Sequence, residues 1–375
     1  MTIGILSSRP LEDKNFLSGT IYSMTEKLKS TGATVKWIPV RDSVFWLDTY
    51  LKISNKISKF IPGLGRFLPK HTLLKCRIIG KNYDRSLIDS CDVIFNPLQS
   101  EAQFCLETQK PIVYFSDATF HAMVDYYWFN IPEKEKQERE LIERTAIQNA
   151  TALIYPCQWA ADSAVRDYGQ SEDKIKIARF GPNFDIESIK PHEFSFDGHL
   201  DILFVGLDWK RKGGILAVDA CRWLNENGID TTLHIVGGQG MDKSTAALPF
   251  VDYKGIRNKN NPEDYAIMQS LYMNADCFLL PTKAECTGVS FCEASAYGLP
   301  CFSHLTGGVS DYVFEGENGR LLPLGSTGED FGRLIKDCIA SGEMKKMSRG
   351  AVKVAKDILS WDMWLKTMTE VLTSV

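Results

Sequence analysis

Two glutamates eight residues apart form the clearest chemical signal in the chain. Glu285 and Glu293 lie in PTKAECTGVSFCEASAYGLP (281–300), which follows an apolar run and leads into a helical pattern. At such a position a carboxylate can accept hydrogen bonds from hydroxyl groups, and N–H groups at a helix start can bind a phosphate or sugar oxygen. As an isolated pair, these glutamates are more typical of solvated or capping acids, but the strand-end, Pro and Gly context favours a binding site. The N–H groups concerned belong to Thr287, Gly288 and Val289.

A basic turn provides the second candidate. FVGLDWKRKGG (204–214) reads as a strand that ends at Gly206, followed by a turn into a helix. Arg211 and Lys212 at this point have the charge to bind a diphosphate, and Gly213 would permit close backbone approach. Basic triplets usually lie on solvated surfaces, so the turn alone is weak evidence.

Two further candidates come from the first half of the chain. NFLSGTIYSM (15–24) places Gly19 and Thr20 at the start of a helix, where N–H groups can approach an anion but where a plain helix cap is the commoner role. IVYFSDATFHAM (112–123) places Asp117 just after a strand-like run, with His121 four residues later. His121 reads as a structural residue or as part of an acceptor site.

Strand-like runs alternate with helical patterns along the whole chain, which predicts βαβ units and parallel sheets. We expect two doubly wound, Rossmann-like domains with a ligand cleft between them, because such sheets bind ligands beyond the carboxyl ends of their strands. An aperiodic segment, 180–198, reads as the linker and hinge. The expected strands are 3–7, 34–40, 92–96, 112–116, 152–155, 175–179, 201–206, 232–236, 277–281 and 300–303, and the expected helices are 19–30, 134–150, 158–168, 214–226, 262–274, 290–297 and 358–372.

Composition agrees with this organisation. The 375 residues exceed what one hydrophobic core usually serves, and 44% hydrophobic with 24% charged residues is ordinary for a globular protein. No apolar run is long enough to span a bilayer, and the start of the chain does not resemble a signal peptide. The ten cysteines include no CxxC pair. We therefore expect a cytoplasmic protein with reduced thiols.

Residues 51–85 stand apart because they carry nine Lys or Arg and a single acid, while the whole chain has a net charge of −4. The early part of this stretch interleaves lysines with apolar residues, which suits a short amphipathic helix on an anionic membrane surface. A basic connecting helix with a solvated face is the alternative. Nucleic acid is disfavoured, since there is no recognised binding fold and the pI is about 5.9.

The sequence resembles family 4 of the glycosyltransferases, retaining enzymes of GT-B architecture. The resemblance rests on the E-x7-E pattern of Glu285 and Glu293, followed by Ala-Ser-Ala-Tyr-Gly-Leu-Pro, and it extends over nearly the whole chain. It implies an N-terminal acceptor-binding domain over 1–182, a C-terminal nucleotide-sugar domain over 183–357, and a terminal helix in 358–375 that packs back on the first domain.

The resemblance also implies roles for the residues. Glu285 would contact the donor sugar, and Glu293 the ribose. Lys212 would bind the donor diphosphate, with Arg211 in place of the family arginine. The remaining implied positions are Ile256 and Gly238 at the nucleoside, Gly19 facing the donor phosphates, Thr20 and His121 on the acceptor side, and Asp117 where the family commonly has a histidine near the reacting sugar.

The function expected from these residues is retaining transfer of a sugar from a nucleotide-diphosphate donor, a UDP-sugar favoured, to a glycan or lipid-linked glycan. We expect neither a cofactor nor a metal, because the chain has no D-x-D motif and its six histidines show no zinc-site spacing. The protein would act in the cytoplasm, at the inner face of the plasma membrane where 51–85 meets that surface. Two alternatives stay open: a nucleotide-sugar epimerase of the same architecture, and a non-catalytic GT-B partner subunit.

Overall fold

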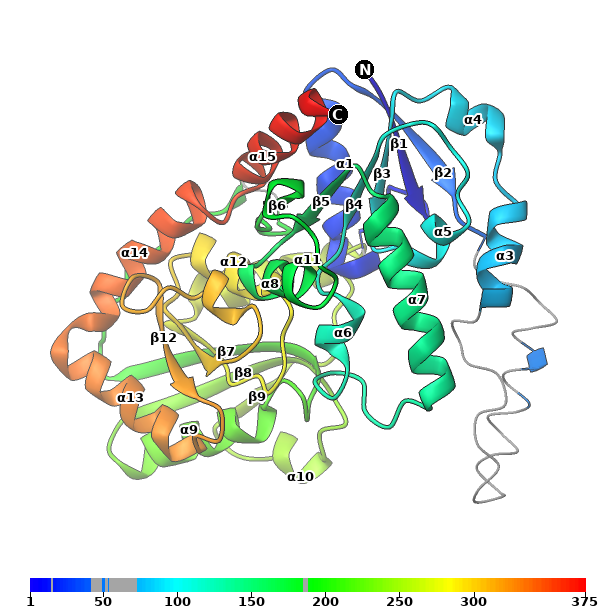
Figure 1. The fold of residues 1–375 in the computed structure, drawn as a ribbon. Helices are drawn as coiled ribbons and strands as arrows, with labels where there is room; N and C mark the ends of the chain where they lie inside the picture. Colours follow the sequence, from blue (N-terminus) through cyan, green and yellow to red (C-terminus); the bar gives the residue numbers. More distant parts are fainter. Residues whose placement is uncertain (15, 42–48, 51–52, 54–72, 185–187) are drawn as a thin grey trace.

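The computed structural model describes residues 1–14, 16–41, 49–50, 53, 73–184 and 188–375. Within them the chain forms two parallel sheets of six strands each, with helices packed around both (Figure 1). The prediction of two Rossmann-like α/β units is confirmed. The terminal helices follow the second unit in sequence and run back toward the first (Figure 1).

The first sheet has the strand order β2-β1-β3-β4-β5-β6, and every pair in it is parallel. Its strands are β1 (Thr2–Ser7), β2 (Thr34–Pro39), β3 (Val93–Pro97), β4 (Ile112–Phe115), β5 (Ala152–Tyr155) and β6 (Ile175–Ile177). Its helices are η1 (Phe16–Gly19), α1 (Thr20–Ser30), α3 (Leu73–Lys81), α4 (Arg85–Asp89), α5 (Ser100–Phe104), α6 (Phe120–Met123), α7 (Glu133–Asn149), α8 (Gln158–Arg166) and η2 (Glu172–Lys174).

The second sheet has the order β12-β11-β10-β7-β8-β9 and is also parallel throughout. Its strands are β7 (His199–Asp208), β8 (Asp230–Gln239), β9 (Val251–Tyr253), β10 (Cys277–Leu280), β11 (Cys301–Leu305) and β12 (Gly319–Pro323). The helices after the linker are α9 (Gly214–Glu226), α10 (Lys243–Ala246), α11 (Pro262–Asn274), α12 (Val289–Ala296), η4 (Val309–Asp311), α13 (Gly328–Ser341), α14 (Glu343–Asp357) and α15 (Trp361–Ser374).

Four of the strands expected from apolar runs are fully buried. All residues of β3, β4, β5 and β10 are buried, as parallel sheets between helices require. The two strands that the apolar runs did not predict, β9 and β12, form the two edges of the second sheet and stay half exposed. The apolar runs did predict β2 and β6, the partly exposed edge strands of the first sheet, so an edge position alone does not explain the two omissions.

The chain crosses between the units twice. No described residue between Ile177 and His199 lies in a strand or α-helix, in keeping with the expected linker. Further on, α15 packs against α1 and β6 of the first unit. There the Trp361 Nε1 donates to the carbonyl of Pro182 at 2.9 Å, and the buried Trp364 ring meets Phe95 edge to face. The domain boundary at 182/183 stays a prediction.

Direct bonds also join the two units. The carboxylate of Asp311, in η4 of the second unit, is buried and forms an ion pair with Arg179 of the first at 2.5 Å. Its other oxygen accepts from the backbone N–H of Gln158 at 2.9 Å. Next to it, the hydroxyl of Tyr312 donates to the carbonyl of Pro156 at 3.1 Å. A buried charge with this many partners fixes the relative position of the two units.

The basic stretch is described only in part. Its proposed amphipathic helix, around Leu51 to Ile61, lies mostly outside the described residues, whereas α3 and the start of α4 cover its last part. Across the described ranges, none of the helices has the length and apolar character needed to cross a membrane.

Candidate functional site

Two cavities lie at the carboxyl ends of the two sheets, where ligands bind in folds of this kind. The C-terminal cavity, about 470 Å³, is lined by residues at the ends of β7 and β8 and by residues after β9 and β10, with Lys14 reaching it from the first unit. The N-terminal cavity, about 440 Å³, is lined by residues after β1, β3 and β4 and by side chains of α3 and α7. Both cavities lie at these edges because the turns after the strands of a parallel sheet gather at the carboxyl ends of the strands.

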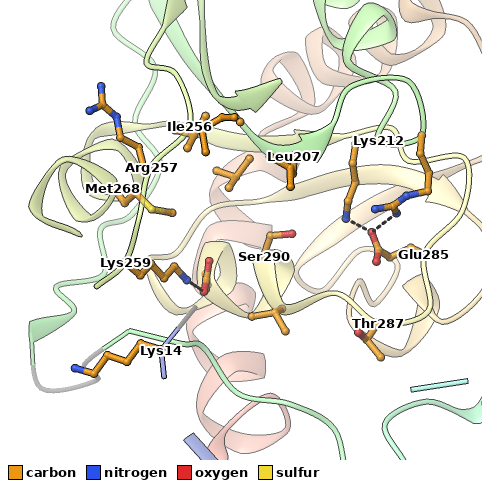
Figure 2. A pocket seen from close by; sticks show the side chains of 17 residues that line it. Lys14, Leu207, Lys212, Ile256, Arg257, Lys259, Met268, Glu285, Thr287 and Ser290 are labelled. Atoms are coloured by element: carbon orange, nitrogen blue, oxygen red, sulfur yellow. Dashed lines mark hydrogen bonds and ion pairs between the residues drawn. The ribbon is translucent and has the colours of Figure 1, made fainter. Parts of the chain in front are cut away.

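The predicted diphosphate residues and the first predicted glutamate meet in the C-terminal cavity. Lys212 Nζ forms an ion pair with Glu285 Oε2, and Figure 2 shows the two side chains pointing toward each other. Arg211 Nη1 lies 3.7 Å from the same oxygen and donates to the carbonyl of Ala284 at 2.8 Å. The side chains of Lys212 and Glu285 are only 14% and 10% exposed. One carboxylate therefore neutralises two largely buried cations.

A glycine positions this basic turn. Gly213 has a φ of 74°, and a Cβ there would overlap the carbonyl of Pro281 at the end of β10. The close approach predicted for this glycine is therefore made to the neighbouring strand end. It brings Lys212 beside the loop that carries Glu285.

The second predicted glutamate lies at the opposite end of the same cavity. Glu293, in α12, is buried, and its two oxygens have different partners: Lys259 Nζ pairs with Oε1, and the Tyr272 hydroxyl donates to Oε2 at 3.0 Å. Lys259 lies across the cavity from Lys212 (Figure 2) and also covers the ring of Phe184 at 4.5 Å. Sequence reasoning missed Lys259, although it examined the segment YKGIRNKN that contains it.

The remaining predicted residues of the second unit divide into two groups. Thr287, Val289 and Ile256 line the C-terminal cavity, and Ile256 is 61% exposed at its rim. Two glycines do not line it. Gly288 contacts the ring of Phe291 instead, and at the end of β8 it is Gly237 that reaches the cavity, one residue before Gly238.

Gly19 and Thr20 line neither cavity. Gly19 has a φ of 87° and a Cβ there would press on the carbonyl of Lys14, while the Thr20 hydroxyl accepts from Asn183 Nδ2 at 3.4 Å. The Ser23 hydroxyl donates to the same amide at 2.8 Å. These residues begin α1 and contact the linker, and the residue of this loop that enters the C-terminal cavity is Lys14.

His121 also lines neither cavity. Its side chain is 60% exposed, with Nε2 3.9 Å from Asp167, and it lines a separate open hollow of about 660 Å³.

Asp117 lines the N-terminal cavity next to Ser116 and Ala118. Burial, with a smaller contribution from the nearby charge of Glu285, raises the pKa of its carboxyl to about 6. Asp117 lines the N-terminal cavity, but its carboxyl is also affected by the charge of Glu285, which lines the C-terminal cavity. A carboxyl that titrates near neutrality is suited to accept or release a proton.

The N-terminal cavity combines aromatic rings with charged groups. The guanidinium of Arg139 lies over the rings of Trp128 and Phe120, at 5.0 and 5.7 Å. Deeper in, the Tyr114 hydroxyl donates to the carboxyl of Glu143 at 3.2 Å, and burial raises the pKa of Glu143 to about 8. Flat rings beside hydrogen-bonding groups form a surface on which a sugar ring can bind.

Two tyrosines from the first unit complete the cluster at Glu285, and sequence reasoning missed both. The Tyr127 hydroxyl accepts from Arg211 Nη1 at 2.7 Å and donates to Glu285 Oε1 at 3.4 Å. The Tyr126 hydroxyl accepts from the backbone N–H of Glu285 at 2.9 Å. No motif marked these residues, because a tyrosine pair in a loop carries no spacing signal.

With this geometry in place, comparison with known proteins agrees on the class. Residues 185–353 match the family model described as Glycosyl transferases group 1. D-inositol 3-phosphate glycosyltransferase from Pseudarthrobacter chlorophenolicus is 26% identical over 202 residues, which are 51% of this chain and 48% of that protein. The chain spans about half the length of the curated relatives it matches.

Solved structures with the same fold cover the whole chain. Anabaena HepE in complex with UDP has a TM-score of 0.68 at 16% identity, with 100% of both chains covered. WaaG, a glycosyltransferase involved in lipopolysaccharide biosynthesis, has a TM-score of 0.66 at 15% identity, again with 100% of both chains covered. These likenesses show the GT-B fold. Together with the family match, they support a glycosyltransferase.

Proposed function

We propose that this protein transfers a sugar from a nucleoside-diphosphate donor to a hydroxyl group of a glycan or lipid-linked glycan, with retention of configuration at the anomeric carbon. The observation that carries the proposal is the C-terminal cavity itself. It has Arg211, Lys212 and Glu285 at one end and Glu293 at the other, which supports a donor whose sugar and diphosphate bind at the first end and whose ribose binds at the second.

The chemistry follows from the charges. When the bond between the anomeric carbon and the diphosphate breaks, negative charge develops on the leaving oxygen, and Lys212 and Arg211 would stabilise it. The start of α12 at Val289, which lines the cavity together with the preceding Thr287, adds the positive end of a helix. These groups supply the positive charge, so we assign no metal to the reaction. Glu285, released from Lys212, would accept hydrogen bonds from the sugar.

Glu293 would bind the ribose hydroxyls. We favour a UDP-sugar as the donor, in line with the UDP bound by the structurally similar HepE. The acceptor would lie in the N-terminal cavity, where Trp128 and Phe120 offer flat surfaces and Asp117 faces the cavity. Its hydroxyl would attack from the side of the leaving group, and the diphosphate would take its proton.

Location is part of the same proposal. A lipid-linked acceptor would be reached at the cytoplasmic face of a membrane, with the basic stretch 51–85 against anionic lipid. A phosphorylated polyol, as in the name of the inositol phosphate relatives, is a second form of acceptor with which Arg139 and Lys75 of the N-terminal cavity are compatible.

The test is nucleotide release from a panel of UDP-, GDP- and ADP-sugars in EDTA, with and without membrane extract. The proposal predicts release from one donor, stimulated by the extract, with a labelled sugar transferred to material in it. Interconversion of free nucleotide sugars without an acceptor would instead establish an epimerase. Tight nucleotide binding with no turnover under any condition would establish a non-catalytic subunit.

A further inference from the structure

Residues 123–128, here called the bridging turn, connect α6 to the segment before α7 and lie between the two cavities. The turn is held by its own backbone, because the N–H groups of Tyr126, Tyr127 and Trp128 all donate to the carbonyl of Met123, at 3.3, 2.9 and 3.0 Å. Asp125 takes a left-handed conformation with a φ of 59°. A non-glycine residue in that region indicates a backbone shape that its surroundings impose.

One side of the bridging turn belongs to the N-terminal cavity. Met123 and Trp128 line that cavity, and the Trp128 ring contacts the guanidinium of Arg139. The sulfur of Met123 also lies 3.2 Å from the thiol of Cys286, the residue after Glu285. The bridging turn therefore contacts both the proposed acceptor site and the loop that carries Glu285.

On the other side, Tyr126 holds the backbone of Glu285. Its hydroxyl accepts from the Glu285 N–H at 2.9 Å and lies 2.9 Å from the hydroxyl of Thr306, on the loop after β11. The ring packs against Trp159 with centroids 5.0 Å apart, which restricts its rotation. A rigid ring with a hydroxyl bonded to two loops fixes those loops relative to each other.

Tyr127 holds the side chains. Its hydroxyl lies between Arg211, which donates to it, and Glu285, to which it donates, and its ring lies under the guanidinium at 4.6 Å. Burial raises the pKa of Tyr127, so the hydroxyl stays protonated and available as a donor. Tyr126 and Tyr127 are absent from the lining of the C-terminal cavity, so they act on the donor through Glu285 and Arg211.

We infer that Tyr126 and Tyr127 are positioning residues for the transfer reaction: from the acceptor-side unit, they fix the carboxylate of Glu285 and the guanidinium of Arg211 for the donor. The inference rests on the proposed function. It means that the donor site is complete only when the bridging turn of the other unit is in place.

The test compares Tyr126→Phe and Tyr127→Phe with Tyr168→Phe, which loses a buried hydroxyl in the same unit. The Tyr168 hydroxyl accepts from the His121 N–H and donates to Glu140, and it lies outside both cavities. Three quantities are measured for each variant: UDP affinity by calorimetry, nucleotide release from UDP-, GDP- and ADP-glucose, and amide hydrogen exchange over residues 283–287.

Tyr126→Phe is expected to lower the turnover number about tenfold or more, because the Glu285 N–H loses its acceptor and the backbone that positions the carboxylate is no longer held. Its UDP affinity is expected to stay within about twofold of wild type, since the nucleotide contacts are untouched. Exchange at Glu285 is expected to accelerate. Tyr127→Phe is expected to lower turnover similarly, and Tyr168→Phe to change none of the three.

If Tyr126→Phe keeps the turnover number of wild type and the same amide hydrogen exchange at Glu285, the inference is overturned and the proposed function is left intact. An equal loss in Tyr168→Phe would also overturn it, since any buried hydroxyl would then serve as well. A wild-type protein that turns over no donor contradicts the proposed function instead. In that case the exchange comparison alone decides, and unchanged exchange at Glu285 overturns the positioning role.

Discussion

Among single residues, the lysine and arginine side chains of the C-terminal cavity that carry the donor proposal are paired with carboxylates. Glu285 is the shared counter-ion of Lys212 and Arg211, and Glu293 is the counter-ion of Lys259. Burying a cation without a partner is costly, so each carboxylate stabilises the empty site. A bound diphosphate would replace Glu285 as the partner of both cations and release it for the sugar.

Asp117 provides a prediction on stability. Its pKa in the folded protein, about 6, lies above the ordinary value of 3.8, so the folded state binds this proton more tightly than the unfolded state does. Stability from this group is present below about pH 4 and is lost as the pH rises through about 6. Asp117→Asn removes the titration. The free energy of unfolding of the variant minus that of wild type is therefore expected to be larger, which means a relatively more stable variant, at about pH 7 than at about pH 4.5.

Urea unfolding of both proteins at the two pH values measures this difference. A difference between variant and wild type that is the same at both values would contradict the raised pKa. A difference of the opposite sign would mean that the folded protein stabilises the charged carboxylate.

The residues that could be predicted from the sequence lie in the turns after strands or near the start of the helix that follows. Arg211, Lys212, Glu285 and Glu293 meet in one cavity because βα turns of a parallel sheet gather at one edge. The pattern does not decide which of two successive residues reaches the cavity. Gly237 lines it, whereas the predicted Gly238 does not. Lys259, Tyr126 and Tyr127 come from loops whose path depends on tertiary packing, and no local pattern predicts it.

At the scale of elements, the same division holds. Several long helices and the buried strands were predicted from local patterns, whereas α13 and α14, of 14 and 15 residues, were not among the expected helices. The expected helices 214–226 and 262–274 coincide with α9 and α11, and the latter begins with an Asn261 side-chain cap followed by Pro262. The short helices α5 and α6, of five and four residues, are too brief to show a helical period.

The loop after β11 makes an element-scale prediction through Gly307. This glycine has a φ of 51°, and a Cβ there would overlap both the carbonyl of Glu285 and the hydroxyl of Tyr126. Gly316 is a matched control, because it also has a positive φ, of 72°, but nothing lies within 4 Å of its Cβ position. Both alanine variants carry the backbone cost of about 1 kcal/mol.

Gly307→Ala is expected to lose donor turnover, whereas Gly316→Ala is expected to keep it. Gly307→Ala is also expected to unfold at a lower temperature than Gly316→Ala. Thermal unfolding and nucleotide release measure the two effects. Equal behaviour of the two variants would show that the Glu285 loop tolerates displacement.

At the scale of the whole molecule, the two units are held together by a buried ion pair. Arg179→Met leaves the Asp311 carboxylate buried without its cation, and a loss of about 3 kcal/mol in the free energy of unfolding is expected. Arg349→Met is the control, since Arg349 pairs with Glu193 at the surface, where solvent screens the charges and a much smaller loss is expected.

Calorimetry is expected to show the two units unfolding in one transition in wild type and separating in Arg179→Met. If the variant and the control lose the same stability, the Asp311 contact does not couple the units.

We propose that Lys212 acts on a donor diphosphate in the C-terminal cavity. The most direct test measures nucleotide release from the donor panel in EDTA by wild type, Lys212→Met and Lys210→Met. Lys210 lies two residues earlier on the same turn, is exposed and does not line the cavity. If Lys212 has this role, wild type is expected to release nucleotide from one donor, Lys212→Met to lose about a hundredfold or more of that rate, and Lys210→Met to stay within about twofold of wild type. Equal rates in the two variants, or no release by wild type from any donor, would contradict it.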